Sequence, residues 1–223
     1  MDKTQYLSMA KAWQFTEEHA ARRQSSETAD ARALAQESGL PQSSAAQSAM
    51  LAMLARVSGA RSVITVGTAS VVEAMELVRG LHGEGMLTAV ESSAQGIAVI
   101  RKAFDLVPDQ VATRLRAVHA SADAFLPRLN AGDYDLIVVS GDASNYTPAF
   151  EQAHRLLRRG GFVVFTDTLA LASPTSVGGV FNPANREDKA VFMRGFVDVV
   201  ESDERFDATF SSAGTGMLVA VKN

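Results

Sequence analysis

The sequence predicts an α/β fold with a mostly parallel, seven-stranded, doubly wound sheet, an antiparallel last strand and helices on both faces. Short apolar runs rich in β-branched residues alternate with helical patterns for five rounds along the chain. Two more strand patterns, separated by Gly214-Thr215-Gly216, then end the chain as a hairpin. Alternating strands and helices form parallel sheets covered on both sides, and a terminal hairpin adds an antiparallel edge.

The composition limits the function classes. The 223 residues, 47% hydrophobic and 21% charged, are enough for one sizeable domain with a helical extension. The net charge of −4 lacks the basic surplus of a nucleic-acid binder. Without cysteine, disulfides and thiolate metal sites are excluded. Apolar runs fall short of the ~18 residues of a membrane span, and residues 1–5 lack a signal peptide's apolar core. We therefore expect a cytoplasmic protein that binds neither nucleic acid nor membrane.

Residues 1–40 read as a polar, helical extension, and residues 41–223 as the main domain. Trp13 and Phe15 are large apolar side chains in this extension, and we expect them to pack on the main domain or on a second subunit. Exposed apolar side chains of this size favour a homodimer. Gly39-Leu40-Pro41 ends the extension.

The main domain begins with a helix that Ser43 or Ser44 can cap. Its apolar residues at helical spacing are Met50, Leu51, Leu54 and Val57. Strands are expected at 63–66, 86–90, 115–119, 135–139 and 162–165, and in the hairpin at 206–210 and 217–221. Helices are expected to start near 71 and to include 97–106, 125–129, 149–157 and 188–200, with 158–161 a turn and 172–187 a loop. The last helix carries Val191, Phe192, Phe196 and Val199 on its apolar side.

Ligands of such sheets bind where the parallel strands end. The groups at these positions are Gly67, Glu91, the turn Ala120-Ser121-Ala122, Ser140 and Asp167, and we expect them to line one crevice. Small residues after the first strand let a ligand approach the backbone, and the following helix offers free N–H groups. With a single glycine, the same pattern also fits an ordinary strand-to-helix turn.

From about residue 40 onward the chain resembles the class I S-adenosylmethionine-dependent O-methyltransferases of the catechol and caffeoyl-CoA branch. The family's Glu-Ile-Gly-Thr-x-x-Gly matches residues 65–71, its acidic end of strand two matches Glu91, and its Gly-Asp-Ala turn matches residues 120–122. The aspartate-rich motif of strand four aligns with residues 134–146, Leu-Leu-x-x-Gly-Gly with residues 156–161, and the terminal Gly-Asp-Gly turn with residues 214–216. The resemblance implies a Rossmann-like domain, S-adenosylmethionine as cofactor, a small-molecule methyl acceptor and a homodimer.

The resemblance also implies a set of cofactor-binding residues, namely Ser44, Gly67, Thr68, Ser70, Glu73, Glu91, Ser92, Ser121, Ala122 and Ser140. Glu91 would accept hydrogen bonds from the ribose diol. Ser121 and Ala122 would lie beside the adenine, and Ser140 beside the methionyl amine. Two assignments stay open, because Ser44 fits a helix cap equally well and Glu73 fits a first-turn acid stabilised by the helix dipole.

The chain departs from this family at its metal site. Two aspartates and an asparagine hold a divalent cation in the family, and the matching residues here are Ser140, Asp167 and Thr168. One carboxylate is too little for Mg²⁺ or Ca²⁺, so we expect no metal. The family's lysine, which assists deprotonation of the acceptor, is Ala143 here. The remaining candidates for a catalytic base are Asp142, Asp167 and, last, His119.

Two functions therefore remain in competition. The first is a metal-independent O-methyltransferase acting on a small molecule. The second is a catalytically degenerate methyltransferase-fold protein that binds a ligand or a partner without turnover. A nicotinamide dehydrogenase is disfavoured because a Gly-x-Gly-x-x-Gly turn is absent.

Overall fold

The computed structural model describes residues 3–67, 70–171 and 178–223, and within these ranges no helix is both long and apolar enough to span a membrane. The helices are α1 (Lys3–Arg22), α2 (Ser26–Glu37), α3 (Ala45–Val57), α4 (Val71–Leu81), α5 (Ala94–Phe104), α6 (Ala122–Phe125), α7 (Tyr146–Leu156) and α8 (Asp188–Glu201), with 3₁₀ turns η1 (Leu126–Arg128) and η2 (Ala143–Asn145). The strands are β1 (Ser62–Val66), β2 (Met86–Glu91), β3 (Arg114–His119), β4 (Tyr134–Val139), β5 (Leu157–Thr166), β6 (Phe206–Ser211) and β7 (Met217–Lys222).

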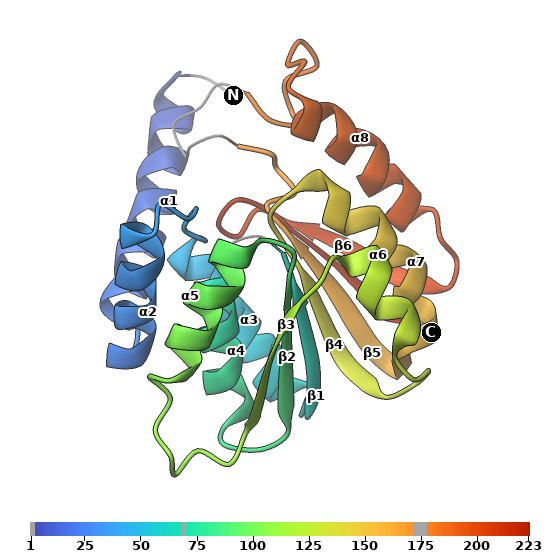
Figure 1. Ribbon diagram of the computed structural model, residues 1–223. Coiled ribbons are helices and arrows are strands. Elements are labelled where there is room, and N and C mark those ends of the chain that lie inside the picture. The colour runs from blue at the N-terminus through green and yellow to red at the C-terminus, as the bar shows by residue number, and fades with distance from the viewer. Residues whose placement is uncertain (1–2, 68–69, 172–177) are drawn as a thin grey trace.

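The seven strands form one sheet in the order β3-β2-β1-β4-β5-β7-β6 (Figure 1). The pairs among β1 to β5 are parallel, and β7 runs antiparallel to both β5 and β6. The predicted sheet and its antiparallel last strand are therefore confirmed. Since β1 pairs with β2 on one side and with β4 on the other, the direction of winding reverses between β1 and β4. Ligands of open α/β sheets bind at such a switch point.

Helices cover both faces of the sheet (Figure 1). Because side chains alternate along a strand, Leu136 and Val138 of β4 pack on the side of α3 and α4, whereas Ile137 and Val139 pack on the side of α6, α7 and α8. The second side contains a cluster of aromatic rings in which Tyr146 contacts Phe165, Phe192 and Phe196. These two cores pack against the strands whose ends form the predicted crevice.

Strand β5 differs from its prediction. Residues 158–161, expected to form a turn, belong to the strand, which begins directly after α7 at Leu157. Leu157 pairs with Tyr134, but the next partner pair is Phe162 with Leu136, so the register shifts across a bulge. Gly160 adopts a positive φ of 74° there. The glycines therefore make a bulge within the strand instead of ending the helix before it.

The predicted apolar faces of two helices are wrong in part. In α3, Leu51 is buried, but Met50 and Val57 are exposed. In α8, Val191 and Val199 are exposed, and the buried side consists of Ala190, Met193, Phe196 and Val200. Apolar residues lie all around both helices, so the spacing alone did not identify the face that meets the sheet. Two boundaries also differ, because α7 begins at residue 146 and α5 ends before residue 106.

The two N-terminal helices pack on the main domain. Helix α1 packs along α3, and α2 packs against α4 and α5. Trp13 donates a hydrogen bond from Nε1 to the carbonyl of Gly214 at 2.9 Å, in the β6–β7 turn. The sequence left open whether Trp13 packs on the main domain or on a second subunit, and in the structure it contacts the main domain. Phe15 remains 64% exposed.

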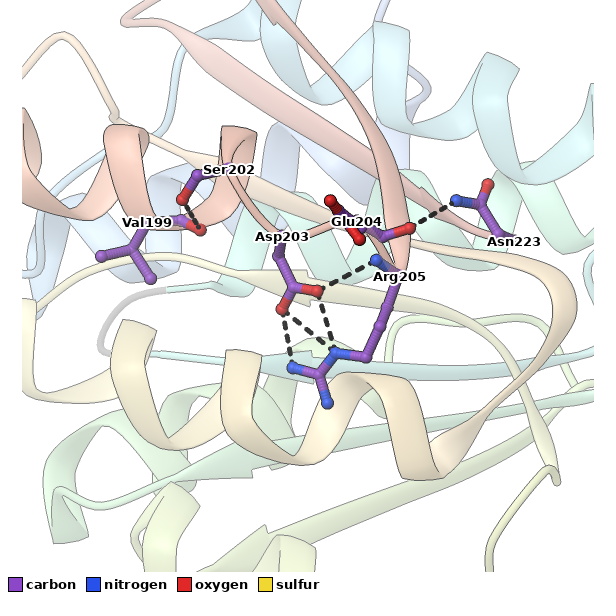
Figure 2. Close-up of polar contacts among 6 residues, drawn as sticks. All are labelled: Val199, Ser202, Asp203, Glu204, Arg205 and Asn223. Atoms are coloured by element: carbon purple, nitrogen blue, oxygen red, sulfur yellow. Dashed lines mark hydrogen bonds and ion pairs between the residues drawn. The ribbon is translucent and has the colours of Figure 1, made fainter.

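A tight turn connects α8 to the edge strand β6 (Figure 2). Arg205 donates to both carboxylate oxygens of Asp203, with its shortest contact, from Nη2, at 2.6 Å. Hydrogen bonds from Arg205 hold the pKa of Asp203 below its ordinary value. Asn223 donates from Nδ2 to the carbonyl of Glu204 at 3.0 Å and so fastens the chain end beside this turn (Figure 2).

Candidate functional site

The ends of β1 and β4 meet at the switch point. The Ser140 N–H donates to the Val66 carbonyl at 2.9 Å, and the Gly67 N–H donates to the Val90 carbonyl at 3.2 Å. Gly67 has a φ of 140°, and a Cβ there would lie 2.2 Å from the carbonyl oxygen of Ser140. Glycine is required at this position because the two strand ends approach so closely.

Two adjoining cavities lie beyond these strand ends. The inner cavity, of about 380 Å³, includes Glu73, Ser140, Asp142 and Asp167 in its wall. The outer cavity, of about 580 Å³, lies between α1 and the main domain and includes Trp13 and Asp167 in its wall. Residues common to both walls are Pro41, Gln42, Ser43, Asp167 and Lys189. The structure therefore brings four of the predicted site residues together in the inner cavity.

Glu73 is 1% exposed, although it lies in the first turn of its helix. Helix α4 is enclosed by α2, α3 and α5, so its acidic first turn lies away from solvent. The side chains of Thr166 and Gln47 donate to Glu73 Oε1 at 3.1 and 3.4 Å. The Ser140 hydroxyl also interacts with the Glu73 carboxyl and, like Thr166 and Gln47, lowers its pKa. Burial first, and then the charge of Asp167, raise the pKa of Glu73 to about 7.

Asp167 lies immediately after β5 with a φ of 55°. Its carboxylate accepts a short hydrogen bond from the Thr215 hydroxyl. The Thr215 hydroxyl also lies 3.1 Å from Oε1 of Gln47, so this group connects the β6–β7 turn to α3. Asp142 is exposed at the mouth of the inner cavity. Both predicted base candidates on strands four and five therefore reach the same cavity.

Lys189 is a wall residue that the sequence analysis did not identify. It lies in the first turn of α8 and donates from Nζ to the Gly141 carbonyl at 2.9 Å. The same Nζ lies 5.7 Å from the centre of the Tyr146 ring, a distance suitable for a cation–π contact. Lys189 is 48 residues from Gly141 along the chain, so no local pattern indicated the contact.

Glu91 lies in a second group of residues, one strand away. It is 1% exposed at the end of β2, and its Oε1 accepts the N–H of Ser93 at 2.7 Å. A Cβ on Gly96 would lie 2.7 Å from the Glu91 carboxyl carbon, so the first turn of α5 packs tightly against it. Ser92 is exposed, and its carbonyl lies 3.0 Å from Nε2 of His119. These residues do not belong to either cavity wall described above.

The remaining predicted cofactor residues are distributed along the same edge of the sheet. Ser44 caps α3 by accepting the Gln47 N–H at 3.1 Å, which confirms the capping role; it also contributes to the outer cavity. Ser70 is fully buried and its hydroxyl is without a partner among the described residues. Ser121 is exposed and Ala122 is buried at the start of α6. Thr68 lies outside the described residues.

The residues that match the family's metal ligands are poor metal ligands here. Ser140 and Thr168 contribute only buried, neutral hydroxyls. Within that part, His, Asp and Glu side chains form no cluster of three or more that could hold a metal ion. A neutral hydroxyl is a weak ligand for a hard divalent cation.

Comparison with protein families matches residues 18–223 to the O-methyltransferase family. A curated relative from Mycobacterium marinum, whose name assigns it provisionally to the O-methyltransferases, is 30% identical over 179 residues, which are 78% of this chain and 75% of the relative.

Solved structures of O-methyltransferases are also similar. An O-methyltransferase from Bacillus cereus, crystallised with SAH, is 19% identical with a TM-score of 0.79, covering 96% of this chain and 100% of that one. The O-methyltransferase TomG from Streptomyces achromogenes, crystallised with SAM, is 22% identical with a TM-score of 0.73, covering 96% and 98%. At these identities the structural likeness establishes a shared fold.

Proposed function

Because this chain belongs to the O-methyltransferase family, we propose that it transfers a methyl group from S-adenosylmethionine to an oxygen of a small molecule, without a metal ion. The observation that carries the proposal is the crevice at the β1–β4 switch point, which lies within the residues matched to the family. The similar structures from B. cereus and S. achromogenes, crystallised with SAH and SAM, support the choice of cofactor.

The residues along this edge suit the cofactor. S-adenosylmethionine supplies a methyl group on a sulfonium, so alignment with the acceptor provides much of the rate. Glu91 would bind the ribose, Ser121 and Ala122 would lie beside the adenine, and Gly67 and Ser140 would lie beside the amino acid end. The buried Ser70 hydroxyl, which has no partner among the described residues, can hydrogen-bond the cofactor. The inner cavity would then receive the acceptor next to Asp142 and Asp167.

Calorimetric titration with S-adenosylmethionine and S-adenosylhomocysteine tests cofactor binding. We expect both to bind, with one site per chain. Methyl transfer to a panel of phenols and carboxylic acids, with and without EDTA, then tests turnover and metal independence. Absence of binding by both compounds contradicts the proposed function, and loss of activity in EDTA that Mg²⁺ restores contradicts metal independence.

The substituted metal ligands favour a second candidate, a degenerate methyltransferase-fold protein that binds a ligand without turnover. Ser140 and Thr168 replace two of the metal ligands in the resembling family, and Ala143 replaces the lysine that assists acceptor deprotonation. Cofactor binding would be retained in this case, so only the turnover measurement separates the two functions.

We also propose that the protein is a homodimer that uses the exposed apolar side chains of α1 and α3. Met50, Met53 and Val57 lie three and four residues apart, so they share one exposed face of α3. Phe15 is exposed on α1, which packs along α3. Sedimentation should therefore give a dimer at micromolar concentration, and Met53→Glu should shift it to a monomer. A wild-type monomer contradicts the proposal. The cytoplasmic location and the absence of nucleic-acid and membrane binding stay predictions.

A further inference from the structure

Lys189 brings a positive charge to the acidic inner cavity. Four carboxyl groups share the wall of this cavity, namely those of Glu73, Asp142, Asp167 and Asp188. Among the described wall residues, Lys189 alone is a Lys or Arg. Because Lys189 also belongs to the wall of the outer cavity, it lies where the two cavities adjoin.

Two neutral groups hold the Lys189 ammonium. Its Nζ donates to the Gly141 carbonyl at 2.9 Å and lies 5.7 Å from the centre of the Tyr146 ring. The ring is itself fixed, because the Tyr146 hydroxyl donates to the Thr166 carbonyl at 2.8 Å. Within the described ranges, Lys189 forms no ion pair with a carboxylate. An ammonium has three N–H donors, so the contact with Gly141 leaves donors that can reach a ligand.

Helix stability does not explain a lysine at this position. Lys189 lies in the first turn of α8, where the helix dipole disfavours a cation. Asp188, the residue before it, is the kind of side chain that the dipole favours there. Lys189 is also half-buried, and ordering a lysine side chain costs conformational entropy. A cation kept in place against these costs indicates a role in the cavity.

Methyl transfer to oxygen places negative charge in this cavity. The acceptor hydroxyl gives its proton to a carboxylate of the wall, and a lone pair of its oxygen forms the new bond to the methyl carbon. S-adenosylmethionine supplies the methyl group, and the electron pair of the broken carbon–sulfur bond stays on sulfur. The carboxylates of the wall would repel the developing oxyanion. A fixed ammonium offsets this repulsion and stabilises the oxyanion.

We propose that Lys189 is a catalytic residue that contacts the acceptor oxygen and stabilises its negative charge. The inference rests on the proposed function, to which it adds a cation supplied by helix α8. Asp142 and Asp167, which lie on the same cavity wall, are then left to receive the proton. Lys189 therefore separates the stabilisation of the oxyanion from the transfer of the proton.

The consequence can be measured as the pKa of a bound phenol. The other charged groups around such a ligand are Glu73, Asp142, Asp167 and Asp188 on the inner wall, and Glu17, Glu18 and Arg32 on the outer wall. The phenol of Tyr146 stays neutral beside Lys189, because burial raises its pKa well above the ordinary value. Nearby carboxylates raise the pKa of a bound phenol, and nearby cations lower it. Removing the Lys189 charge alone should therefore raise that pKa.

The test uses 4-nitrophenol and 4-nitrocatechol, whose ionised forms differ in colour from the neutral forms. Each probe is titrated with pH on the protein saturated with S-adenosylhomocysteine, so that the measurement needs no turnover. Lys189→Gln removes the charge and keeps an N–H donor for the Gly141 carbonyl. The pKa of the bound probe should rise by about 1–2 units in this variant.

Lys102→Gln is the matched control for the loss of one positive charge. Lys102 is exposed in the last turn of α5 and belongs to neither cavity wall. This variant should leave the pKa of both bound probes unchanged. Lys189→Arg, which keeps the charge, should retain most of the wild-type effect on the probes.

Turnover provides a second readout. With an acceptor phenol that is only weakly acidic, kcat of Lys189→Gln should fall about 100-fold, and Lys189→Arg should restore part of it. The affinity for S-adenosylmethionine should stay within about twofold of the wild type. If thermal melting shows that Lys189→Gln is not folded, Lys189→Met takes its place.

An unchanged pKa of the bound probes in the folded variant overturns the inference, and so does a wild-type protein that binds neither probe. A loss of S-adenosylmethionine affinity that accounts for the whole loss of turnover also overturns it, because Lys189 would then act on the cofactor. Failure of the wild-type protein to bind S-adenosylmethionine and S-adenosylhomocysteine overturns the proposed function instead.

Discussion

Replacing Asp135 should destabilise the sheet more than replacing any single surface charge. Asp135 lies in β4, and its Oδ2 accepts the N–H groups of Arg61 and Ser62 at 2.6 and 2.9 Å, where the chain enters β1. Its Oδ1 pairs with Nε of Arg158 at 2.6 Å, in the bulge of β5. One carboxylate therefore connects three neighbouring strands at the edge opposite the crevice.

The magnitude follows from these contacts. Asp135→Ala removes two charge-assisted hydrogen bonds to backbone N–H groups, and leaves those partly buried donors without an acceptor. Hydrogen bonds to charged groups contribute about 1.5–3 kcal/mol each, and water can restore part of this at partly buried donors. The ion pair adds at most about 1 kcal/mol, because the Arg158 side chain is 53% exposed. We therefore expect a loss of about 3–4 kcal/mol in the free energy of unfolding.

Urea unfolding monitored by circular dichroism gives this free energy. The comparison requires that the free energy of unfolding falls with urea concentration at the same slope in the variant and in the wild type. Asp135→Asn keeps an oxygen acceptor for the two N–H groups and should lose about 1–2 kcal/mol. Arg158→Ala removes only the ion pair and should lose no more than about 1 kcal/mol. A loss below 1 kcal/mol for Asp135→Ala, or equal losses for Asp135→Ala and Arg158→Ala, would refute the reasoning.

Four further predictions concern the site. Glu91→Ala should weaken S-adenosylmethionine binding by about 1.5–3 kcal/mol; an unchanged dissociation constant removes Glu91 from the site. The double variant Ser140→Asp, Thr168→Asn should raise Mg²⁺ affinity by calorimetry, and no gain would mean that the alignment of these strand ends is wrong. Tyr146→Phe loses a 2.8 Å hydrogen bond to a buried β5 carbonyl and should cost about 1–2 kcal/mol in urea unfolding, without reducing cofactor affinity. Folding raises the pKa of Glu73 from 4.5 to about 7. The stability that the neutral carboxyl contributes is therefore fully present below pH 4.5, and about 3 kcal/mol of the free energy of unfolding is lost as the pH rises through about 7. Urea unfolding of the ligand-free protein should show lower stability at about pH 8 than at about pH 5, and Glu73→Gln should abolish this difference.

Much of the fold was predictable because it depends on local patterns. Val63, Ile64 and Val66 form a β-branched apolar run, and such a run suits a strand that is buried on both faces. The same reasoning located β1 to β4 to within a residue or so at each end, but it missed the first five residues of β5. Since parallel strands all end at one edge, Ser140 and Asp167 could be placed at a common crevice without coordinates, whereas Gly67 and Glu91, predicted to line the same crevice, lie outside both cavity walls.

Local patterns were insufficient where a helix is apolar on more than one side. Helix α3 has Met50 and Val57 as well as Leu51, and only the packing of α1 and α4 decides which of them is buried. The bulge in β5 was missed for a similar reason, since Gly160 reads as a turn until its pairing with β4 is known.

The chemistry of the site was decided by tertiary structure alone. In sequence, Glu73 is an ordinary first-turn acid, and its burial arises because α2, α3 and α5 enclose α4. Its partner Thr166 is 93 residues away, and Thr215 lies 168 residues from Gln47. The pKa of a side chain and the number of its hydrogen bonds depend on desolvation and on its neighbours in space. The sequence by itself therefore determined which residues follow the ends of the parallel strands. The folded chain determined which of those residues are buried, charged and unpaired.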